Sequence, residues 1–99
     1  MRRGTTPSHT FTTDIDLTGA EVIYITYKQN GMTVMEREIG DMSISPTEVT
    51  VELSQTDTLM FRAGGTVEVQ IRARFQDGTA VASNIMTTTA NRILKEGVI

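Results

Sequence analysis

Polar and apolar residues alternate along most of the chain with a period of two, which is the pattern of half-buried β-strands. The clearest case is residues 67–75, VEVQIRARF, in which the odd-numbered positions are apolar and the even-numbered positions are charged or polar. Residues 49–53 repeat this pattern, and residues 20–28 are apolar at more positions, which predicts a central strand covered on both faces. The remaining expected strands are residues 9–13 at an edge, 32–39, 80–88 and a short one at 42–45.

Turn residues separate these strands at regular intervals. Asn30-Gly31 and Asp77-Gly78 supply the backbone angles that tight hairpins need, and each dipeptide lies between two strand patterns. Pro46 presets a turn before the strand at residues 49–53. The pattern therefore indicates antiparallel strands joined mainly by hairpins.

One segment departs from the β pattern. Ser54 is followed three residues later by Asp57, a variant of the capping box that predicts a single helical turn. The turn lies where the chain of a sandwich must cross between sheets, and Leu59 and Phe61 are expected to close that end of the core.

These elements predict an all-β fold, an immunoglobulin-like β-sandwich of about seven short antiparallel strands with one helical turn at the crossover. A small barrel is the main alternative. With 99 residues the chain has material for one core, so residues 1–99 are expected to form a single domain.

The two ends of the chain are less regular. Residues 1–8 are expected to form a flexible N-terminal arm, with Arg2 and Arg3 in it. Residues 90–99 form a C-terminal tail that either packs back on the sandwich or docks on a neighbouring molecule. The aliphatic residues of this tail are candidate contact residues: Ile93, Leu94, Val98 and Ile99.

Composition narrows the range of partners. A net charge of −3 argues against general affinity for nucleic acid, which needs a concentrated basic surface. No apolar run approaches the roughly 20 residues of a membrane span. The chain has no cysteine, and so no disulfide framework or thiolate metal site is expected.

No arrangement of residues predicts catalysis. His9 is the only histidine, and an edge-strand or surface position suits it better than a zinc site or a nucleophile relay. Asp14 and Asp16 could bind a cation as a pair, although they more simply shape the turn that follows. Arg72 and Arg74 on the outer face of their strand could contact a partner or simply be solvated. We therefore expect no catalytic residues, cofactor or metal.

Four segments carry a resemblance to a known group of proteins. The chain resembles short proteins encoded in prophages of Gram-positive bacteria, and the order of its features is similar to the immunoglobulin-like N-terminal module of phage baseplate upper proteins. The segments are MRRGTTPSHTF at residues 1–11, ITYKQ at 25–29, LSQTDTL at 53–59 and DGTAVASNI at 77–85.

The resemblance implies a structural protein of the virion, in the tail, the baseplate or another part, made in the bacterial host cytoplasm. Its expected partners are other virion proteins or further copies of itself, with sheet edges and the apolar tail as contact surfaces. An alternative is a module that recognises host cell-surface glycan through its loops. A third is a regulator of a host protein.

Overall fold

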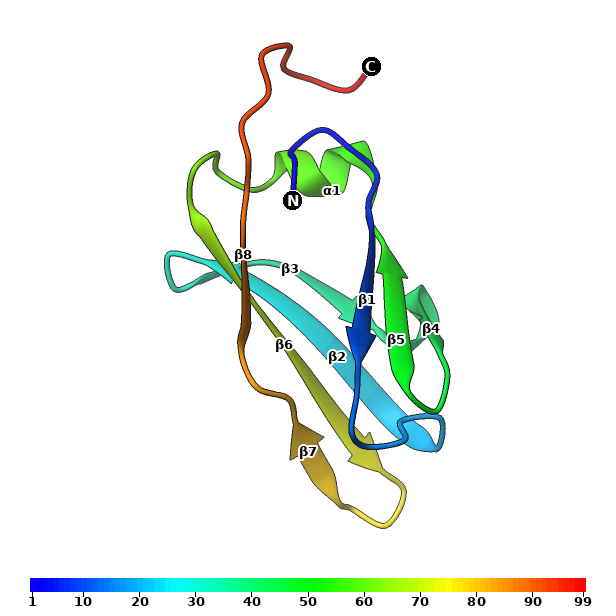
Figure 1. Cartoon of the computed structure of the whole chain (residues 1–99). Helices are drawn as coiled ribbons and strands as arrows, with labels where there is room; N and C mark the ends of the chain where they lie inside the picture. The colour runs from blue at the N-terminus through cyan, green and yellow to red at the C-terminus, as the bar shows by residue number, and fades with distance from the viewer.

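Two antiparallel sheets make up most of the computed structural model, which describes residues 1–99 (Figure 1). One sheet has the strand order β1-β5-β4, and the other has the order β3-β2-β6, with β7 and β8 both on the remaining side of β6. The strands are β1 (Ser8–Thr12), β2 (Ala20–Gln29), β3 (Met32–Glu38), β4 (Met42–Ile44), β5 (Glu48–Glu52), β6 (Thr66–Phe75), β7 (Ala80–Ala82) and β8 (Met86–Thr89).

The core lies between the two sheets, because the apolar alternation directs one face of each strand inward. Strands β2 and β6 pair along most of their length, and β5 supplies the facing side chains from the smaller sheet. The largest fully buried side chains are Tyr27, Phe61, Ile23, Ile25, Val49, Val51, Val67 and Thr58. The domain is thus the predicted immunoglobulin-like β-sandwich, and the separate sheets exclude the barrel.

Two short helical segments carry the chain between the sheets. The 3₁₀ helix η1 (Ile39–Asp41) leads from β3 to β4, and α1 (Gln55–Leu59) leads from β5 back to β6. The predicted capping box is confirmed: the Asp57 amide donates to Ser54 Oγ at 3.1 Å, and the Ser54 amide donates to Asp57 Oδ2 at 2.9 Å. Phe61 is buried at this end of the core as expected, while Leu59 is half-buried.

The predicted hairpins are confirmed as well. Asn30 and Gly31, between β2 and β3, both have positive φ, at 54° and 74°, as a two-residue hairpin turn requires. Between β6 and β7 the Thr79 amide donates to Asp77 Oδ1 at 2.9 Å, and Gly78 has a φ of 90°. Local turn chemistry therefore sets both connections.

Strand β2 is not covered on both faces, in contrast to the prediction. Its inward side chains are buried, but Tyr24 is 41% exposed on the other face, and Lys28 is exposed there too. The smaller sheet covers only the inner face of the larger one, and no element packs on the outer face. The additional apolar residues of β2 therefore lie on a surface.

The predicted strand at residues 80–88 is divided into β7 and β8. Both halves pair with β6, and the chain bulges at Ser83 between them. There the Ile71 amide donates to Ser83 Oγ at 3.0 Å instead of to a backbone carbonyl, and Gln70 Nε2 donates to the Ser83 carbonyl at 3.0 Å. The serine side chain thus substitutes for a backbone acceptor at the break.

The N-terminal segment is bound to the domain and does not form the expected flexible arm. The Met1 ammonium donates to the Thr89 carbonyl at 2.9 Å, and the Asn91 amide donates to the Met1 carbonyl at 2.8 Å. The Arg3 amide donates to the Asn91 carbonyl at 3.1 Å, and Arg3 Nε donates to the Phe61 carbonyl at 2.7 Å. Most of these bonds use backbone atoms, so a polar sequence with no apolar pattern can still be fixed in place.

Candidate interaction site

The free edges of the two sheets differ in how they are protected against pairing with another chain. Strand β3 carries Glu36, Arg37 and Glu38 and pairs with β2 through a register shift, and β4 and β7 have three residues each. Charge, irregularity and shortness are the usual means by which proteins prevent edge-to-edge association. Strands β1 (SHTFT) and β8 (MTTT) contain no Lys, Arg, Asp, Glu or Pro. Neither edge is protected by charge or proline, although the N-terminal segment bonds the carbonyl of Thr89 at the end of β8.

These two edges lie on the same side of the domain (Figure 1). Residues of both strands line a groove between them. We call it the β1–β8 groove. One wall is residues 8–15, the other is residues 81–84 and 86–88, and Leu17, Val69, Ile71 and Ala73 form the floor. The groove therefore joins the free edge of one sheet to the free edge of the other.

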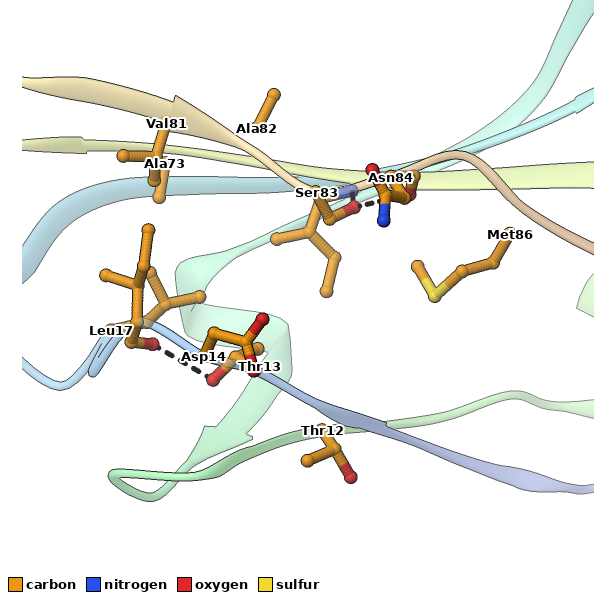
Figure 2. Close-up of a pocket in the computed structure, with 12 residues that line it drawn as sticks. Thr12, Thr13, Asp14, Leu17, Ala73, Val81, Ala82, Ser83, Asn84 and Met86 are labelled. Carbon is orange, nitrogen blue, oxygen red and sulfur yellow. Dashed lines mark hydrogen bonds between the residues drawn. The ribbon is translucent and has the colours of Figure 1, made fainter.

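Two adjoining hollows make up the groove, and Met86 lines both. The hollow between β1 and β8 has a volume of about 390 Å³ and is lined by His9, Phe11 and Val69 among others. The second hollow, of about 330 Å³, lies beside β7. Figure 2 shows Leu17 and Asp14 across from Val81 and Ala73 in this second hollow. Seven of its twelve lining residues are apolar.

The hydrogen bonds of β1 leave alternate backbone groups free. The Leu53 amide donates to the Pro7 carbonyl at 3.0 Å, and the Thr13 amide donates to the Thr47 carbonyl at 2.8 Å. In an antiparallel pair, every second residue directs its N–H and C=O groups toward the partner strand. Because residues 7 and 13 bond the β5 side, the odd-numbered residues of β1 face β5. The N–H and C=O groups of Ser8, Thr10 and Thr12 therefore point to the free edge.

Strand β8 offers fewer free groups. The Ala90 amide donates to the Gly65 carbonyl at 3.1 Å, so even-numbered residues face β6 and odd-numbered residues face outward. The outward groups of Thr89 and Asn91 are bonded to Met1 and Arg3. Within β8 only Thr87 has both its outward N–H and its outward C=O group free of hydrogen bonds.

His9 contributes no positive charge to the groove at neutral pH. Its Nδ1 lies 2.8 Å from the hydroxyl of the buried Tyr27, and its ring packs edge-on against Phe11 at 6.4 Å between centroids. Burial of the imidazole, with repulsion from the N-terminal ammonium, lowers the pKa of His9 from its ordinary value of 6.5. His9 lies in an edge strand, as the sequence analysis expected.

The structure places Arg72 and Arg74 away from the groove. Both side chains lie on the exposed outer face of β6. Arg74 Nη2 lies 3.6 Å from Glu21 Oε2, and each of these side chains is more than half exposed. Solvent screens such a pair, so it adds little to stability.

The C-terminal tail lies at the α1 end of the domain, apart from both the groove and the arginines (Figure 1). Ile93 is half-buried against Gly4, and Gln55 exchanges two hydrogen bonds with the backbone of Ile99, at 2.9 and 3.2 Å. Leu94, Val98 and Ile99 are 89%, 62% and 89% exposed. The tail thus folds back on the domain and still presents three aliphatic side chains to solvent.

The structure holds no cluster typical of a metal site. Nowhere do three or more His, Cys, Asp or Glu side chains come together in a way that could hold an ion. Asp16 Oδ1 accepts hydrogen bonds from the Thr18 hydroxyl at 2.6 Å and the Thr18 amide at 2.9 Å, and these bonds lower the pKa of Asp16. The interpretation of Asp16 as a turn residue is confirmed. None of the helices has the length and apolar character needed to cross a membrane.

The sequence does not reveal the free backbone groups beside the groove. They belong to four small polar residues, Ser8, Thr10, Thr12 and Thr87. The available signal was an edge-strand pattern without charge or proline, at residues 8–12.

Comparison with known proteins gives little. No protein-family model matches the chain, and no curated protein matches it. The chain is similar to one solved structure, the V domain of amphioxus IgVJ-C2, with a TM-score of 0.40 and 15% identity over 94% of this chain and 97% of that chain. The function is therefore inferred from the chain's own residues.

Proposed function

We propose that the domain is a non-catalytic structural module that joins other protein chains through the unprotected strand edges of the β1–β8 groove. The observation that carries this proposal is the uncharged free edge of β1 beside a groove that mixes apolar side chains with hydroxyl groups and has uncharged β8 on its far side. An extended segment that pairs with a free edge gains backbone hydrogen bonds, and its side chains can fill the groove beside it.

The chemistry of the groove supports binding more than turnover. Its ionisable side chains are His9, which bonds Tyr27, and Asp14, which lines the other hollow. The remaining polar groups are backbone atoms, hydroxyls, the amide of Asn84 and the terminal ammonium of Met1, which bonds the Thr89 carbonyl. General acid–base catalysis needs titratable groups within reach of one reacting centre, and the groove does not bring such groups together.

The setting that we propose is the virion of a phage or prophage, in the tail, the baseplate or another part, after synthesis in the host cytoplasm. The sequence resemblance supports this setting, and other virion proteins are the proposed partners. The groove carries no Lys or Arg, which fits a protein partner better than nucleic acid or an anionic membrane surface.

The test is capture of the virion proteins encoded beside this chain by the tagged full-length domain. Thr10→Pro removes an outward amide of β1 and an exposed hydroxyl contact with Thr50, but no backbone bond to β5, and so it should abolish capture while leaving the fold intact. The double variant Arg72→Ala/Arg74→Ala is the matched control on the outer face, and it should bind as the wild type does. Equal capture by Thr10→Pro, or loss only in the arginine variant, would contradict the proposal.

The glycan alternative has a separate outcome. Tyr24 is the one aromatic residue among the exposed large side chains, which gives a poor platform for stacking sugar rings. Competable binding on a glycan array, unaffected by Thr10→Pro and absent in Tyr24→Ala, would favour it over the structural role.

A further inference from the structure

We infer that the α1 end of this domain docks on the opposite end of a second copy, so that copies associate head to tail. The domain is elongated, with extents of 48, 25 and 17 Å. Figure 1 shows α1 and the C-terminal tail at one extreme and the hairpin between β6 and β7 at the other. The contact uses neither strand edge of the β1–β8 groove, and so it goes beyond the proposed function.

Positive charge gathers at the α1 end. Five of the nine Lys and Arg residues of the chain lie there: Arg2, Arg3, Arg62, Arg92 and Lys95. Backbone carbonyls hold two of them in place, because Arg2 Nη1 donates to the Arg92 carbonyl at 2.8 Å and Arg3 Nε donates to the Phe61 carbonyl at 2.7 Å. We call the surface formed by these five residues, with the aliphatic residues described below, the basic end.

Most of this charge has no counter-ion within the domain. Arg3 is paired with Glu96 at 2.8 Å, and Asp57 of α1 is paired with Arg37. Glu52, at the end of β5, is exposed and forms no ion pair. The other four cations of the basic end are exposed and form no ion pair either, so the surface keeps a net positive charge.

Exposed aliphatic side chains lie among these cations. Met60, two residues before Arg62, is 49% exposed, and Leu94, directly before Lys95, is 89% exposed. Four of the nine large hydrophobic residues that the domain exposes belong to this end: Met60, Leu94, Val98 and Ile99. An apolar patch with a charged rim is typical of a surface that docks on another protein.

The opposite end is formed by three connecting segments, residues 13–19, 45–47 and 76–79. The first two are joined by the bond from the Thr13 amide to the Thr47 carbonyl, at 2.8 Å. The first and third lie close together because β2 begins and β6 ends there, in adjacent strands. Sequence positions that are far apart therefore share this surface.

Negative charge dominates the opposite end. Its carboxylates are Asp14, Asp16, Glu21, Glu48 and Asp77. Arg74, at the end of β6, is already paired with Glu21 at 3.6 Å. Ile15, between two of the aspartates, is 46% exposed and gives the surface an apolar centre. We call the surface formed by these five carboxylates and Ile15 the acidic end.

The partner that fits the basic end is a second copy, because the acidic end of that copy carries the complementary charge. Opposite ends of two copies attract each other and like ends repel, which gives the contact its head-to-tail orientation. Contact also withdraws aliphatic side chains of both ends from water. The ends lie at the two extremes of the long axis, so the bodies of the two copies stay apart (Figure 1). Because two different surfaces meet, the contact repeats from copy to copy, as in a ring or a file of subunits.

Charge reversal at each end tests the contact. Arg62→Glu/Arg92→Glu makes the basic end acidic, and Glu21→Lys/Glu48→Lys makes the acidic end basic. Each variant alone then brings like charges together, and it should self-associate about fivefold more weakly than the wild type, or weaker still, in sedimentation velocity at low salt. An equimolar mixture of the two variants should recover the association, because each offers the other an end of opposite charge.

The matched control reverses two carboxylates of edge strand β3, outside both ends. Glu36→Lys/Glu38→Lys changes the net charge as much as Glu21→Lys/Glu48→Lys does, and it should self-associate as the wild type does. Circular dichroism verifies that each variant folds. An equal loss of association in the control, or a mixture of the end variants without recovery, would overturn the inference.

A cross-link of zero length identifies the two ends independently. Carbodiimide joins a lysine amine to a carboxylate with loss of water, and of the two lysines of the chain only Lys95 belongs to the basic end. In a mixture of isotopically light and heavy chains, mass spectrometry should find Lys95 of one copy joined to a carboxylate of the acidic end of another, such as Glu48. The absence of that link, or links between copies made by Lys28 instead, would overturn the inference.

Thr10→Pro separates this inference from the proposed function. It changes neither end, so it should lose the capture of virion proteins and still self-associate. A wild-type chain that stays at 10.9 kDa at every concentration but captures virion proteins removes the head-to-tail contact and leaves the proposed function. A chain that self-associates through its ends and captures no virion protein does the reverse.

Discussion

Strands β1 and β3 both lie at free edges of their sheets, but they face solvent with different chemistry. Strand β3 has seven residues, three of them charged, and its pairing with β2 shifts register between Tyr27 and Lys28. Strand β1 has five residues, none of them acidic or strongly basic, in a regular register with β5. The groove along β1 mixes apolar side chains with hydroxyls, whereas the hollow along β3, of about 490 Å³, is lined almost entirely by polar and charged residues.

The difference indicates which edge is available for contact with another chain. Charged side chains on an edge strand make the approach of a second strand costly, and a regular uncharged edge lacks that protection. Here β1 is longer than β4 and β7, which have three residues each, and it alone has three residues with free outward groups.

The largest expected effect tests the direction of the backbone groups in β1. Thr13 and Thr12 are adjacent residues of the same type, but only the Thr13 amide bonds to the neighbouring segment, at the Thr47 carbonyl. Thr13→Pro should lower the free energy of unfolding by about 2–3 kcal/mol, because it removes that bond and leaves the carbonyl without its partner. Thr12→Pro should change it by less than about 0.5 kcal/mol. Urea unfolding of the two variants measures the difference, and similar losses would mean that the alternation is assigned wrongly.

The next effect concerns the protected side of the domain, where Arg37 of β3 bonds Asp57 of α1 at 2.6 Å. Burial of the Asp57 carboxyl opposes its ionisation, but hydrogen bonds from Arg37 and Ser54 outweigh burial and hold the pKa of Asp57 below 3.8. Asp57→Asn should cost about 1–2 kcal/mol at pH 7, because it removes the ion pair and weakens the capping box.

The same carboxylate gives a pH dependence with a definite sign. Because its folded pKa is lowered, its stabilising effect is complete above the unfolded value of 3.8 and is lost as the pH falls through the folded pKa. Unfolding in urea at several pH values should therefore show a steeper loss below pH 3.8 for the wild type than for Asp57→Asn. Parallel curves would exclude a stabilising role for the ionised carboxyl.

Removing the protection of β3 should make the two edges more alike. In the double variant Glu36→Thr/Glu38→Thr, the edge loses two charges and gains two residues that favour strands. Self-association should strengthen by about 1 kcal/mol, because the charge repulsion between approaching strands is reduced. Sedimentation velocity over a concentration series measures this, and an unchanged profile would show that charge is not what keeps β3 free.

The smallest effect is expected from His9. Because the folded pKa of His9 is lowered, the unfolded chain takes up the proton first, and stability present above pH 6.5 is lost as the pH falls through the folded pKa. His9→Gln should lack this part of the pH dependence while remaining folded. Thermal unfolding between pH 5 and 8 provides the comparison, and a loss of stability that persists unchanged in the variant would assign it to another group.

The sequence predicted the sandwich because alternation in β6 and β5 is strong enough to define a buried face. It did not predict that β2 has an open face, since an apolar side chain such as Tyr24 looks the same in a sequence whether or not another layer covers it. The break at Ser83 was missed because the serine side chain replaces a backbone acceptor there. The attachment of the N-terminus was missed because mainly backbone atoms make it.

The candidate site was harder to predict than the fold. The sequence indicates the tail and Arg72 as candidate contact residues, because aliphatic and charged side chains can be recognised from a sequence alone. The groove instead arises from two long-range pairings, β1 with β5 and β8 with β6, which place distant segments on one side of the sandwich. Its proposed contact atoms are the backbone groups of residues such as Thr10, and side-chain identity does not reveal their direction.

Hydrogen exchange at the β1 amides tests the central claim most directly. In the isolated domain the amides of Ser8, Thr10 and Thr12 have no acceptor, so they should exchange quickly, while those of His9 and Phe11 are bonded to β5 and should exchange slowly. When the chain captures a virion protein, the three fast amides should become slow together. A complex that forms while these three amides remain fast would show that the contact surface lies elsewhere on the domain.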